Sequence, residues 1–369
     1  MTERLLSGRE RSEAEMVNSM KAGVYYGIED IRYEEVPKPQ INDDEYLLKV
    51  RAVAICGSDL RTFLHGHSKV VTPQILGHEF AGDVVEVGKN VKGVSVGDRL
   101  SVHPGIPCGH CYYCQRGLQN LCVDRPGIGT VLPGAFAEYV KIPSKTIEAG
   151  TVFHIPEGKK YELAALGDPA VSALHGEEEL DVRLGDTLCI LGSGSIGILH
   201  AMIARLKGAS TIILVNRSPE RLEKARQMGV ADHYFCLKTD GDLREFVMNV
   251  TDGMGANKVC VANTAKASAV QALEIAAKGG TVEYFAGFPK DDPALGIDGN
   301  LIHYRELKVI GSFGSTPRQF QEAERLLVEE RIPAEKIITH RLPLSKINEG
   351  FGLMKRGECF KVILDPTLD

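Results

Sequence analysis

No apolar run in this chain approaches the roughly 20 residues that a helix needs to cross a bilayer. The sequence also has no internal repeats and no low-complexity segments. The N-terminal stretch MTERLLSGRERSEAEMVNS alternates charges and lacks the apolar core of a signal peptide. An excess of positive charge is missing too: the formal net charge is -6 and the pI is near 6.0. We therefore expect a cytoplasmic protein that binds neither nucleic acid nor a membrane.

The length of the chain and its composition favour two domains. A chain of 369 residues is too long for one ordinary domain. Hydrophobic residues make up 43% and charged residues 25%, which is usual for globular proteins, so each half can bury its own core. Residues 1–19 are interpreted as a helical or disordered N-terminal extension before a first strand near Met20.

The hydrophobic pattern changes along the chain. Up to about residue 165, short alternating runs such as EYLLKVRAVAI and AGDVVEVG predict β-strands joined by turns. From about residue 172, strands alternate with helices, as in DTLCILG, SGSIGILHAMIARLKGA and STIILVN, and Ser218 and Pro219 are expected to begin a helix. This alternation predicts a parallel, doubly wound sheet. The fold class is therefore α/β, with a discontinuous β-rich domain at 20–171 and 309–369 and a nucleotide-binding domain at 172–308.

A glycine-rich turn follows the first strand of the nucleotide-binding domain. In it, Gly192 suits the tight turn, Gly194 lets a pyrophosphate approach, and Gly197 permits close packing of helix on strand. The helix that begins at Ser195 and Ile196 offers free N–H groups to an anion. A plain glycine-rich turn is the alternative, but the strand before and the helix after it favour a dinucleotide site at these residues.

Four of the nine cysteines crowd into one short loop, at Cys108, Cys111, Cys114 and Cys122. Such crowding in a large chain indicates a metal rather than a disulfide framework. The short gaps let the sulfurs face one centre, with zinc–sulfur bonds of about 2.3 Å. Four sulfurs leave no open position, so the predicted zinc is structural. Four further cysteines lie in apolar contexts and are interpreted as inert core thiols: Cys189, Cys236, Cys260 and Cys359.

A second metal site is predicted from residues far apart in the sequence. Cys56 follows one predicted strand and His78 precedes another, so a thiolate and an imidazole can share a metal. Taken singly, they are a core thiol and a turn histidine. Glu79 and Asp168 are the candidates for an oxygen ligand. Asp168 lies in the apolar segment LAALGDPAVSAL, where a carboxylate is costly to bury without a partner, although it could instead cap a helix before Pro169.

Together these motifs resemble the medium-chain zinc alcohol dehydrogenases, and within them the polyol (sorbitol dehydrogenase-like) branch. The resemblance runs from about Met20 to the C-terminus. It is carried by CGSDL, LGHEFAG, VGDRL, the four-cysteine loop, AFAEYV, GSGSIG and HYRELKVIGSFGST, in that order. It implies a GroES-like catalytic domain and a Rossmann domain, with the active site in the cleft between them.

The resemblance also implies roles for single residues. Cys56 and His78 fall on the ligands of the catalytic zinc, Asp59 on a carboxylate that orients the histidine, and Ser58 on the hydroxyl that takes the substrate proton. Asp168 occupies the place of a Cys or an acid in the family.

Two further positions leave questions open. Glu79 matches an acid that approaches or binds the metal in some members. Asp168 is one methylene shorter than the Glu usual in the polyol branch, which leaves the ligand set open, and we expect Asp168 rather than Glu79. Arg61 stands where many members have a relay histidine, so the proton is expected to leave Ser58 through water or through His65 or His67.

The implied reaction is hydride transfer between a secondary alcohol and NAD(P), with a three-ligand zinc that keeps a position open for the substrate oxygen. The substrate is expected to be a polyol or a sugar-derived alcohol, oxidised to a ketone. We expect a homodimer or a homotetramer.

The choice between NAD and NADP depends on the end of the second strand of the nucleotide-binding domain. NAD enzymes usually present an acid there, whereas this chain has Asn216 followed by Arg217, with Arg221 one helical turn on. A guanidinium suits a 2′-phosphate. Asn216 can still bind a free ribose, and Arg217 could be a solvated surface charge. We expect NADP, with use of both cofactors left open.

Three other functions compete with this interpretation: a non-enzymatic relative of the same fold, a zinc-free reductase, and a cysteine-rich zinc module for nucleic acid. The set of Cys56, His78 and a nearby acid disfavours the first two. The acidic balance and the glycine-rich turn disfavour the third.

Overall fold

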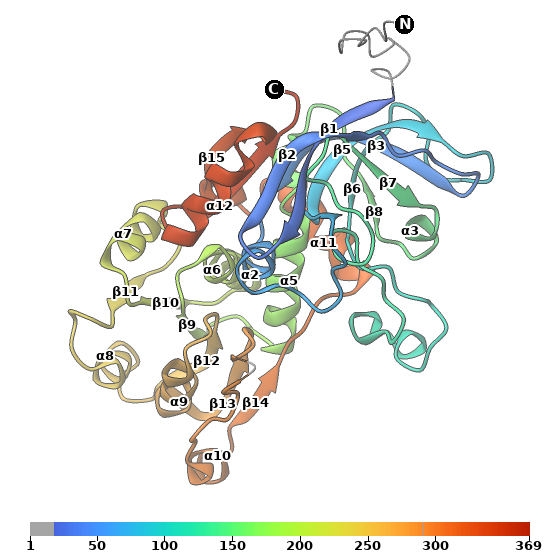
Figure 1. Cartoon of the computed structure of the whole chain (residues 1–369). Helices are drawn as coiled ribbons and strands as arrows, with labels where there is room; N and C mark the ends of the chain where they lie inside the picture. The colour runs from blue at the N-terminus through green and yellow to red at the C-terminus, as the bar shows by residue number, and fades with distance from the viewer. Residues whose placement is uncertain (1–17, 290) are drawn as a thin grey trace, which may run out of the picture.

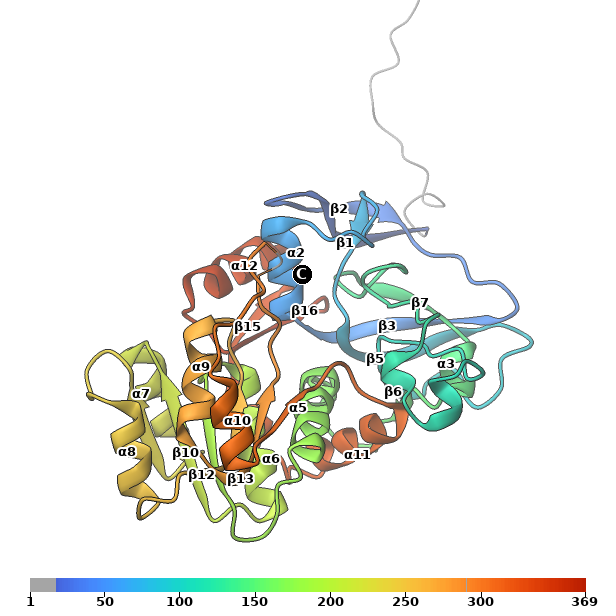
Figure 2. The same cartoon turned by 90° about the horizontal axis from the view of Figure 1, so that it is seen from below.

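The computed structural model describes residues 18–289 and 291–369. The expected extension at residues 1–19 therefore lies outside the described residues except for its last two positions, and the first strand begins at Ser19. Figures 1 and 2 show a β-rich body of blue-to-green strands beside a parallel sheet flanked by helices. Among the described residues, no helix is both long and apolar enough to span a bilayer.

The β-rich body contains a seven-stranded sheet that draws strands from both ends of the chain. Its order is β15-β16-β3-β5-β6-β8, with β7 beside β3, and only β15 and β16 pair in parallel. The strands are β3 (Glu45–Ala54), β5 (Glu79–Val87), β6 (Arg99–Val102), β7 (Tyr139–Pro143), β8 (Val152–His154), β15 (Ile338–Pro343) and β16 (Lys361–Asp365). Because β16 pairs with β3, the C-terminal segment lies against the strand that leads into Cys56.

A three-stranded sheet of order β2-β1-β4 completes this body, and large buried side chains fill its core. Its strands are β1 (Ser19–Gly27), β2 (Asp30–Pro37) and β4 (Gln74–Ile75). Tyr46, Phe80, Phe136 and Phe351 are each at most 1% exposed. Four helices accompany the sheets: α2 (Gly57–His65), α3 (Lys145–Glu148), α4 (Tyr161–Ala164) and α12 (Ile347–Arg356).

The second body is a six-stranded parallel sheet of order β11-β10-β9-β12-β13-β14. Its strands are β9 (Thr187–Leu191), β10 (Thr211–Asn216), β11 (His233–Cys236), β12 (Ala256–Val261), β13 (Ala276–Tyr284) and β14 (Lys308–Gly311). The predicted doubly wound parallel sheet is confirmed. Strand order reverses between β9 and β12, where such sheets bind ligands at the carboxyl ends of their strands. The sheet reaches Gly311, so the strand at the expected domain boundary belongs to the parallel sheet.

Alternation along the strands explains why helices cover both faces of this sheet. In β9, Leu188 and Ile190 pack in a different cluster from Cys189 and Leu191, because successive side chains point to opposite faces. One face is covered by α5 (Gly167–Glu179), α6 (Ser195–Lys207) and α7 (Pro219–Met228), and the other by α8 (Leu243–Val250), α9 (Lys266–Ile275) and α10 (Gly299–Arg305).

Helix α5 links the two bodies. It packs on α6 and on α11 (Pro317–Val328), and α11 in turn contacts α4 of the β-rich body. In Figure 1, α5 is the light-green helix between the two bodies. The predicted start of α7 is confirmed: Ser218 Oγ accepts a hydrogen bond of 3.2 Å from the backbone N–H of Arg221, and Pro219 lies in the first turn.

Candidate active site

Cys56 lies just after β3 and forms the N-terminal cap of α2. Its backbone N–H donates to Asp59 Oδ2 at 3.0 Å, and its sulfur accepts from the backbone N–H of Ser58 at 3.5 Å. This reciprocal arrangement is a capping box, with a thiol in the usual place of a hydroxyl. It fixes the thiol at the end of the strand and aligns Ser58 and Asp59 beside it.

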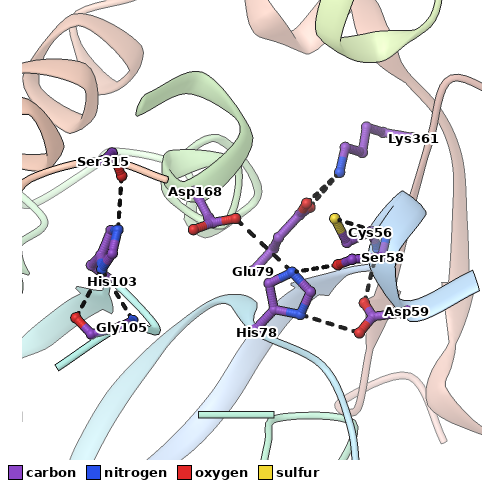
Figure 3. A network of polar contacts seen from close by, with 10 residues as sticks. All are labelled: Cys56, Ser58, Asp59, His78, Glu79, His103, Gly105, Asp168, Ser315 and Lys361. Carbon is purple, nitrogen blue, oxygen red and sulfur yellow. Dashed lines mark hydrogen bonds and ion pairs between the residues drawn. The ribbon is translucent and has the colours of Figure 1, made fainter. Parts of the chain in front are cut away.

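His78 lies just before β5, which pairs antiparallel with β3 and so places the histidine beside Cys56. His78 Nδ1 is 3.1 Å from Asp59 Oδ1, and Nε2 is 3.3 Å from Ser58 Oγ and 3.9 Å from Asp168 Oδ2 (Figure 3). One nitrogen therefore faces a carboxylate that can orient the ring, and the other faces the remaining polar groups. Burial disfavours the imidazolium, but the charges of Asp59 and Cys56 outweigh it and raise the pKa of His78.

Glu79 follows His78 and is held by a buried lysine. Lys361 Nζ donates to Glu79 Oε1 at 2.6 Å and to Oε2 at 2.5 Å, and the two side chains are 3% and 0% exposed. Burial opposes the charge on Lys361, but the Glu79 carboxylate outweighs it and raises the pKa of the lysine. Sequence reasoning missed Lys361, although a lysine inside the apolar strand FKVILD is a signal that a buried partner exists.

Asp168 belongs to the first turn of α5, whose N-terminal cap is Leu166. No side-chain hydrogen bond caps this helix, so the structure does not support the alternative of Asp168 as a capping residue. The Asp168 side chain is 20% exposed and points toward the histidine (Figure 3). Ligand atoms of Cys56, His78 and Glu79 lie within 4.8 Å of one another. Both candidate acids lie near His78, but Glu79 belongs to this group and Asp168 lies beside it. Of the two acids, Glu79 is the one paired with a lysine.

His103 is a second buried histidine, drawn beside the cluster in Figure 3, and sequence reasoning did not identify it. Its Nε2 is 2.9 Å from Ser315 Oγ, and its Nδ1 accepts from the backbone N–H of Gly105 at 3.1 Å. Burial lowers the pKa of His103 to about 4, although Asp168 opposes the shift. The imidazole is therefore neutral at ordinary pH and acts as a hydrogen-bonding bridge.

A cleft of about 530 Å³ joins this cluster to the glycine-rich turn. On the β-rich side it is lined by Cys56, Ser58, His78 and others, and on the other side by Gly194, Ser195 and Ile196. The side chains that line it include Arg61, Asp168, Arg221, Phe285, Cys359 and Lys361. His65 and His67, at the other end of α2, are exposed and do not line it.

The three glycines of the turn have different environments. A Cβ on Gly197 would lie 1.8 Å from the carbonyl oxygen of Gly192, and Gly192 itself has φ +128°. A Cβ on Gly194 would meet only the Arg221 guanidinium, at 4.0 Å. The space over Gly194 at the N-terminus of α6 is therefore a cradle into which a pyrophosphate fits.

Asn216, Arg217 and Arg221, which the sequence suggests as determinants of cofactor preference, lie in different surroundings. Asn216 donates to Ser193 Oγ and accepts from the backbone N–H of Arg217 at 2.6 Å, so its amide holds the turn together. Arg217 is exposed and lines a pocket at the ends of β9, β10 and β12. Arg221 lies instead in the cleft near Gly194, where its Nη2 donates to the carbonyl of Cys359 at 3.4 Å.

The four-cysteine loop forms a separate lobe. Cys108 and Cys114 sulfurs are 3.9 Å apart, as are those of Cys111 and Cys122, and all four lie within 4.8 Å of one another. A tetrahedron with zinc–sulfur bonds of 2.3 Å has edges of about 3.8 Å, so the sulfurs fit one zinc ion. The backbone N–H groups of Cys114 and Val123 lower the pKa of the Cys111 thiol to about 6, which favours the ligating thiolate.

Comparison with known proteins gives matches along nearly the whole chain. Residues 42–156 match the alcohol dehydrogenase GroES-like domain, and residues 195–329 match the zinc-binding dehydrogenase family. A sorbitol dehydrogenase of Halalkalibacterium halodurans is 32% identical over 92% of this chain and 97% of its own. An L-threonine 3-dehydrogenase of Bacillus licheniformis is 33% identical over 90% of this chain and 95% of its own.

A solved structure gives the same match in three dimensions. A zinc-binding dehydrogenase from Sinorhizobium meliloti 1021 bound to NADP superposes with a TM-score of 0.87 at 32% identity. The alignment covers 94% of this chain and 99% of that one.

Proposed function

This chain belongs to the zinc-binding dehydrogenases with an alcohol dehydrogenase GroES-like domain, and on that premise we propose how its cleft oxidises an alcohol. The enzyme is a zinc-dependent oxidoreductase that transfers a hydride between a secondary alcohol and NAD(P). One observation carries the proposal. The glycine-rich turn at the start of α6 and the cluster of Cys56, His78 and Asp168 open into the same cleft.

The donor atoms of the cluster suit a catalytic zinc. A sulfur, an imidazole nitrogen and a carboxylate oxygen are the ligands of zinc sites that keep one position open. We assign the zinc to Cys56, His78 Nε2 and Asp168. Glu79 is a weaker candidate because both of its oxygens already accept hydrogen bonds from Lys361, whose charge would repel a cation.

When bound, zinc supplies Lewis-acid polarisation of the substrate hydroxyl, and the nicotinamide accepts the hydride. The chain's own residues orient the zinc ligand His78 and remove the hydroxyl proton of the alcohol. Asp59 holds Nδ1 of His78, so Nε2 stays directed at the cleft. Ser58 Oγ, beside Nε2 at 3.3 Å, takes the hydroxyl proton of the alcohol and passes it to water. Arg61 cannot take over this proton, because a guanidinium stays protonated at any working pH.

The cofactor is proposed to be bound in two parts. The cradle over Gly194, with N–H groups at Ser195 and Ile196, receives the pyrophosphate. Arg217 lines the pocket at the end of β10, and its guanidinium is the group that we propose binds a 2′-phosphate. Asn216 presents no negative charge that would repel this phosphate. We therefore propose NADP as the preferred cofactor, with Arg221 beside the pyrophosphate rather than the 2′-phosphate.

The substrate is proposed to be a polyol or a sugar-derived secondary alcohol, with a ketone as its product. Polar side chains of the Cys56 cluster line the cleft, and the exposed Arg61 that also lines it can meet a hydroxyl or an anionic group of the substrate. A homodimeric or homotetrameric assembly and a cytoplasmic location stay predictions, and the mass of the purified protein in solution tests the first. The zinc-free and non-enzymatic alternatives find no support in a cluster that keeps a complete set of zinc donors.

The test is a steady-state screen of polyols, amino alcohols and simple secondary alcohols with each cofactor. We expect the highest kcat/KM on a polyol with NADP. In Arg217→Ala, the NADP value is expected to fall about tenfold or more, while the NAD value changes little. Arg226→Ala is the control, because it removes an exposed arginine of helix α7, which follows Arg217, and that arginine pairs with Glu223. A wild type that prefers NAD regardless of Arg217 rejects the cofactor proposal, and activity only on long apolar alcohols rejects the substrate proposal.

A further inference from the structure

Four polar side chains meet inside the nucleotide-binding domain, below the floor of the cleft. They are Glu177 on α5, His200 on α6, Cys260 on β12 and Glu283 on β13, and each is 0% exposed. Cys260 and Glu283 are register partners in neighbouring parallel strands, so their side chains leave the sheet on the same face. Burial of Cys260 is as the sequence predicted, but its neighbours are polar rather than apolar.

The hydrogen bonds of this cluster leave three atoms without a partner. His200 Nδ1 donates to Glu177 Oε1 at 2.8 Å, and Ser312 Oγ donates to Glu283 Oε1 at 2.5 Å. Among the described residues, no partner reaches His200 Nε2, Glu283 Oε2 or Glu177 Oε2. A buried polar atom without a partner costs about 1 to 3 kcal/mol. One ligand shared by His200 Nε2 and Glu283 Oε2 would satisfy two of these three atoms.

The charges of the cluster point to a cation. Within the described residues, neither Glu177 nor Glu283 forms an ion pair with a lysine or an arginine, and His200 is the only basic side chain in contact with them. Ligand atoms of His200, Cys260 and Glu283 lie within 4.8 Å of one another. One imidazole, one thiol and one carboxylate at such separations are the donor set of zinc and related divalent metals.

We propose that His200 Nε2, Cys260 Sγ and the Glu283 carboxylate bind a divalent zinc-class cation in the core of the nucleotide-binding domain. Glu177 is the outer carboxylate that fixes the ring of His200 through Nδ1, as metal-ligating histidines usually require. Binding displaces the thiol proton of Cys260, which leaves to solvent, and the thiolate and carboxylate together neutralise a charge of +2. This site is distinct from the four-cysteine lobe and from the cluster at Cys56.

The position of the site indicates what the cation stabilises. It ties α5, which carries Asp168, to α6, which carries the glycine-rich turn, and to two strands of the sheet. The ring of Phe285 meets that of His200 edge-on at 4.8 Å and itself lines the cleft. A Cβ on Gly176 would lie 2.5 Å from Glu283 Oε1, so the helix passes tightly over the cluster. The cation therefore holds the floor of the cleft at a fixed distance from α5.

Metal counting with matched variants tests the proposal. Cys260→Ala removes a ligand, whereas Cys189→Ala truncates an equally buried cysteine whose side chain lies on the opposite face of the sheet. Both proteins are purified whole, equilibrated with zinc at one equivalent per predicted site, and analysed by elemental mass spectrometry. We expect Cys260→Ala to hold one zinc equivalent fewer than Cys189→Ala, and Cys189→Ala to match the wild type. Equal zinc contents in the two variants overturn the proposal.

A second measurement needs no variant and covers the case in which Cys260→Ala does not fold. Crystals of the wild-type enzyme with zinc, measured at the zinc absorption edge, should show an anomalous peak bonded to His200, Cys260 and Glu283. A water molecule or an empty cluster at that place, in crystals whose cysteine lobe holds zinc, refutes it. Because both readouts concern this cluster alone, they stay independent of the substrate, the cofactor and the catalytic zinc.

Discussion

The two clusters proposed to hold zinc in the β-rich body differ in how the chain builds them. The cysteine lobe takes all its ligands from one loop at residues 108–122, and three of its four sulfurs belong to partly exposed residues. The cluster at Cys56 draws on β3, β5, α5 and, through Lys361, on β16 near the C-terminus. A local site needs only its own loop to form, whereas the dispersed site exists only when the whole enzyme is folded. The dispersed site also has the open cleft that chemistry requires.

The largest expected effect comes from removing a ligand of the dispersed site. Cys56→Ala should lose the catalytic zinc and lower kcat/KM on the order of 10⁴-fold, about 5 kcal/mol, because the Lewis acid is gone. The measurement is turnover together with zinc content. Cys359→Ala, a buried cysteine that also lines the cleft, is the matched control and should keep both within a few-fold. Near-wild-type turnover in Cys56→Ala would remove the basis for a catalytic zinc here.

The next prediction tests whether Asp168 or Glu79 is the third ligand of the catalytic zinc. Glu79→Gln should leave the ammonium of Lys361 buried without a counter-charge and cost about 3 to 5 kcal/mol of the free energy of unfolding. In the double variant Glu79→Gln with Lys361→Met, most of that stability should return. Asp168→Asn should instead lose zinc and turnover while the unfolding transition barely moves. If Glu79→Gln lost zinc and the double variant did not recover it, Glu79 would be the third ligand.

A smaller effect on chemistry is expected from the local site. Cys111→Ser should weaken zinc binding in the lobe about 100-fold or more, since even an outer partner of a ligand is worth 10- to 100-fold. Because the lobe lies outside the cleft, kcat/KM should change less than about threefold in protein that stays assembled. Amide hydrogen exchange should rise in residues 108–122 and not around His78. Complete loss of hydride transfer in a folded, assembled variant would contradict a purely structural lobe.

The same contrast explains what the sequence could reveal. The spacing of residues along the chain was enough to predict the zinc ligands of the cysteine loop, such as Cys108 and Cys111, and the glycines of the turn. The alternation of strands and helices predicted the parallel sheet. Contacts between segments far apart in sequence leave no such pattern. The ion pair of Glu79 with Lys361 and the meeting of His200 with Cys260 depend on strand order and register, which only the fold sets.

The smallest expected effect is a pH-dependent loss of folding stability, and it comes from His103, which lies between the two proposed zinc sites. His103 follows β6 just before the cysteine loop, and its Nε2 reaches Ser315 in the segment that leads into α11. Its charge environment includes Asp168, Arg125 and His78, but burial dominates and lowers its pKa from 6.5 to about 4. As pH falls below 6.5, His103 binds a proton in the unfolded chain but stays neutral in the folded protein. The free energy of unfolding therefore decreases until about pH 4, where the folded protein also binds the proton.

The expected loss is about 2 kcal/mol between pH 7 and pH 5, at 1.36 kcal/mol for each pKa unit crossed. His103→Gln keeps a polar side chain but cannot titrate. Between pH 7 and pH 5 its free energy of unfolding should therefore fall by about 2 kcal/mol less than that of the wild type. Urea unfolding of both proteins at pH 7 and pH 5 measures the difference, and effects of acid on zinc binding are shared and cancel. His65→Gln, which changes an exposed histidine, should follow the wild type. If His103→Gln lost as much stability as the wild type over this range, His103 would take up its proton in the folded protein, and the link through Ser315 would not depend on a neutral imidazole.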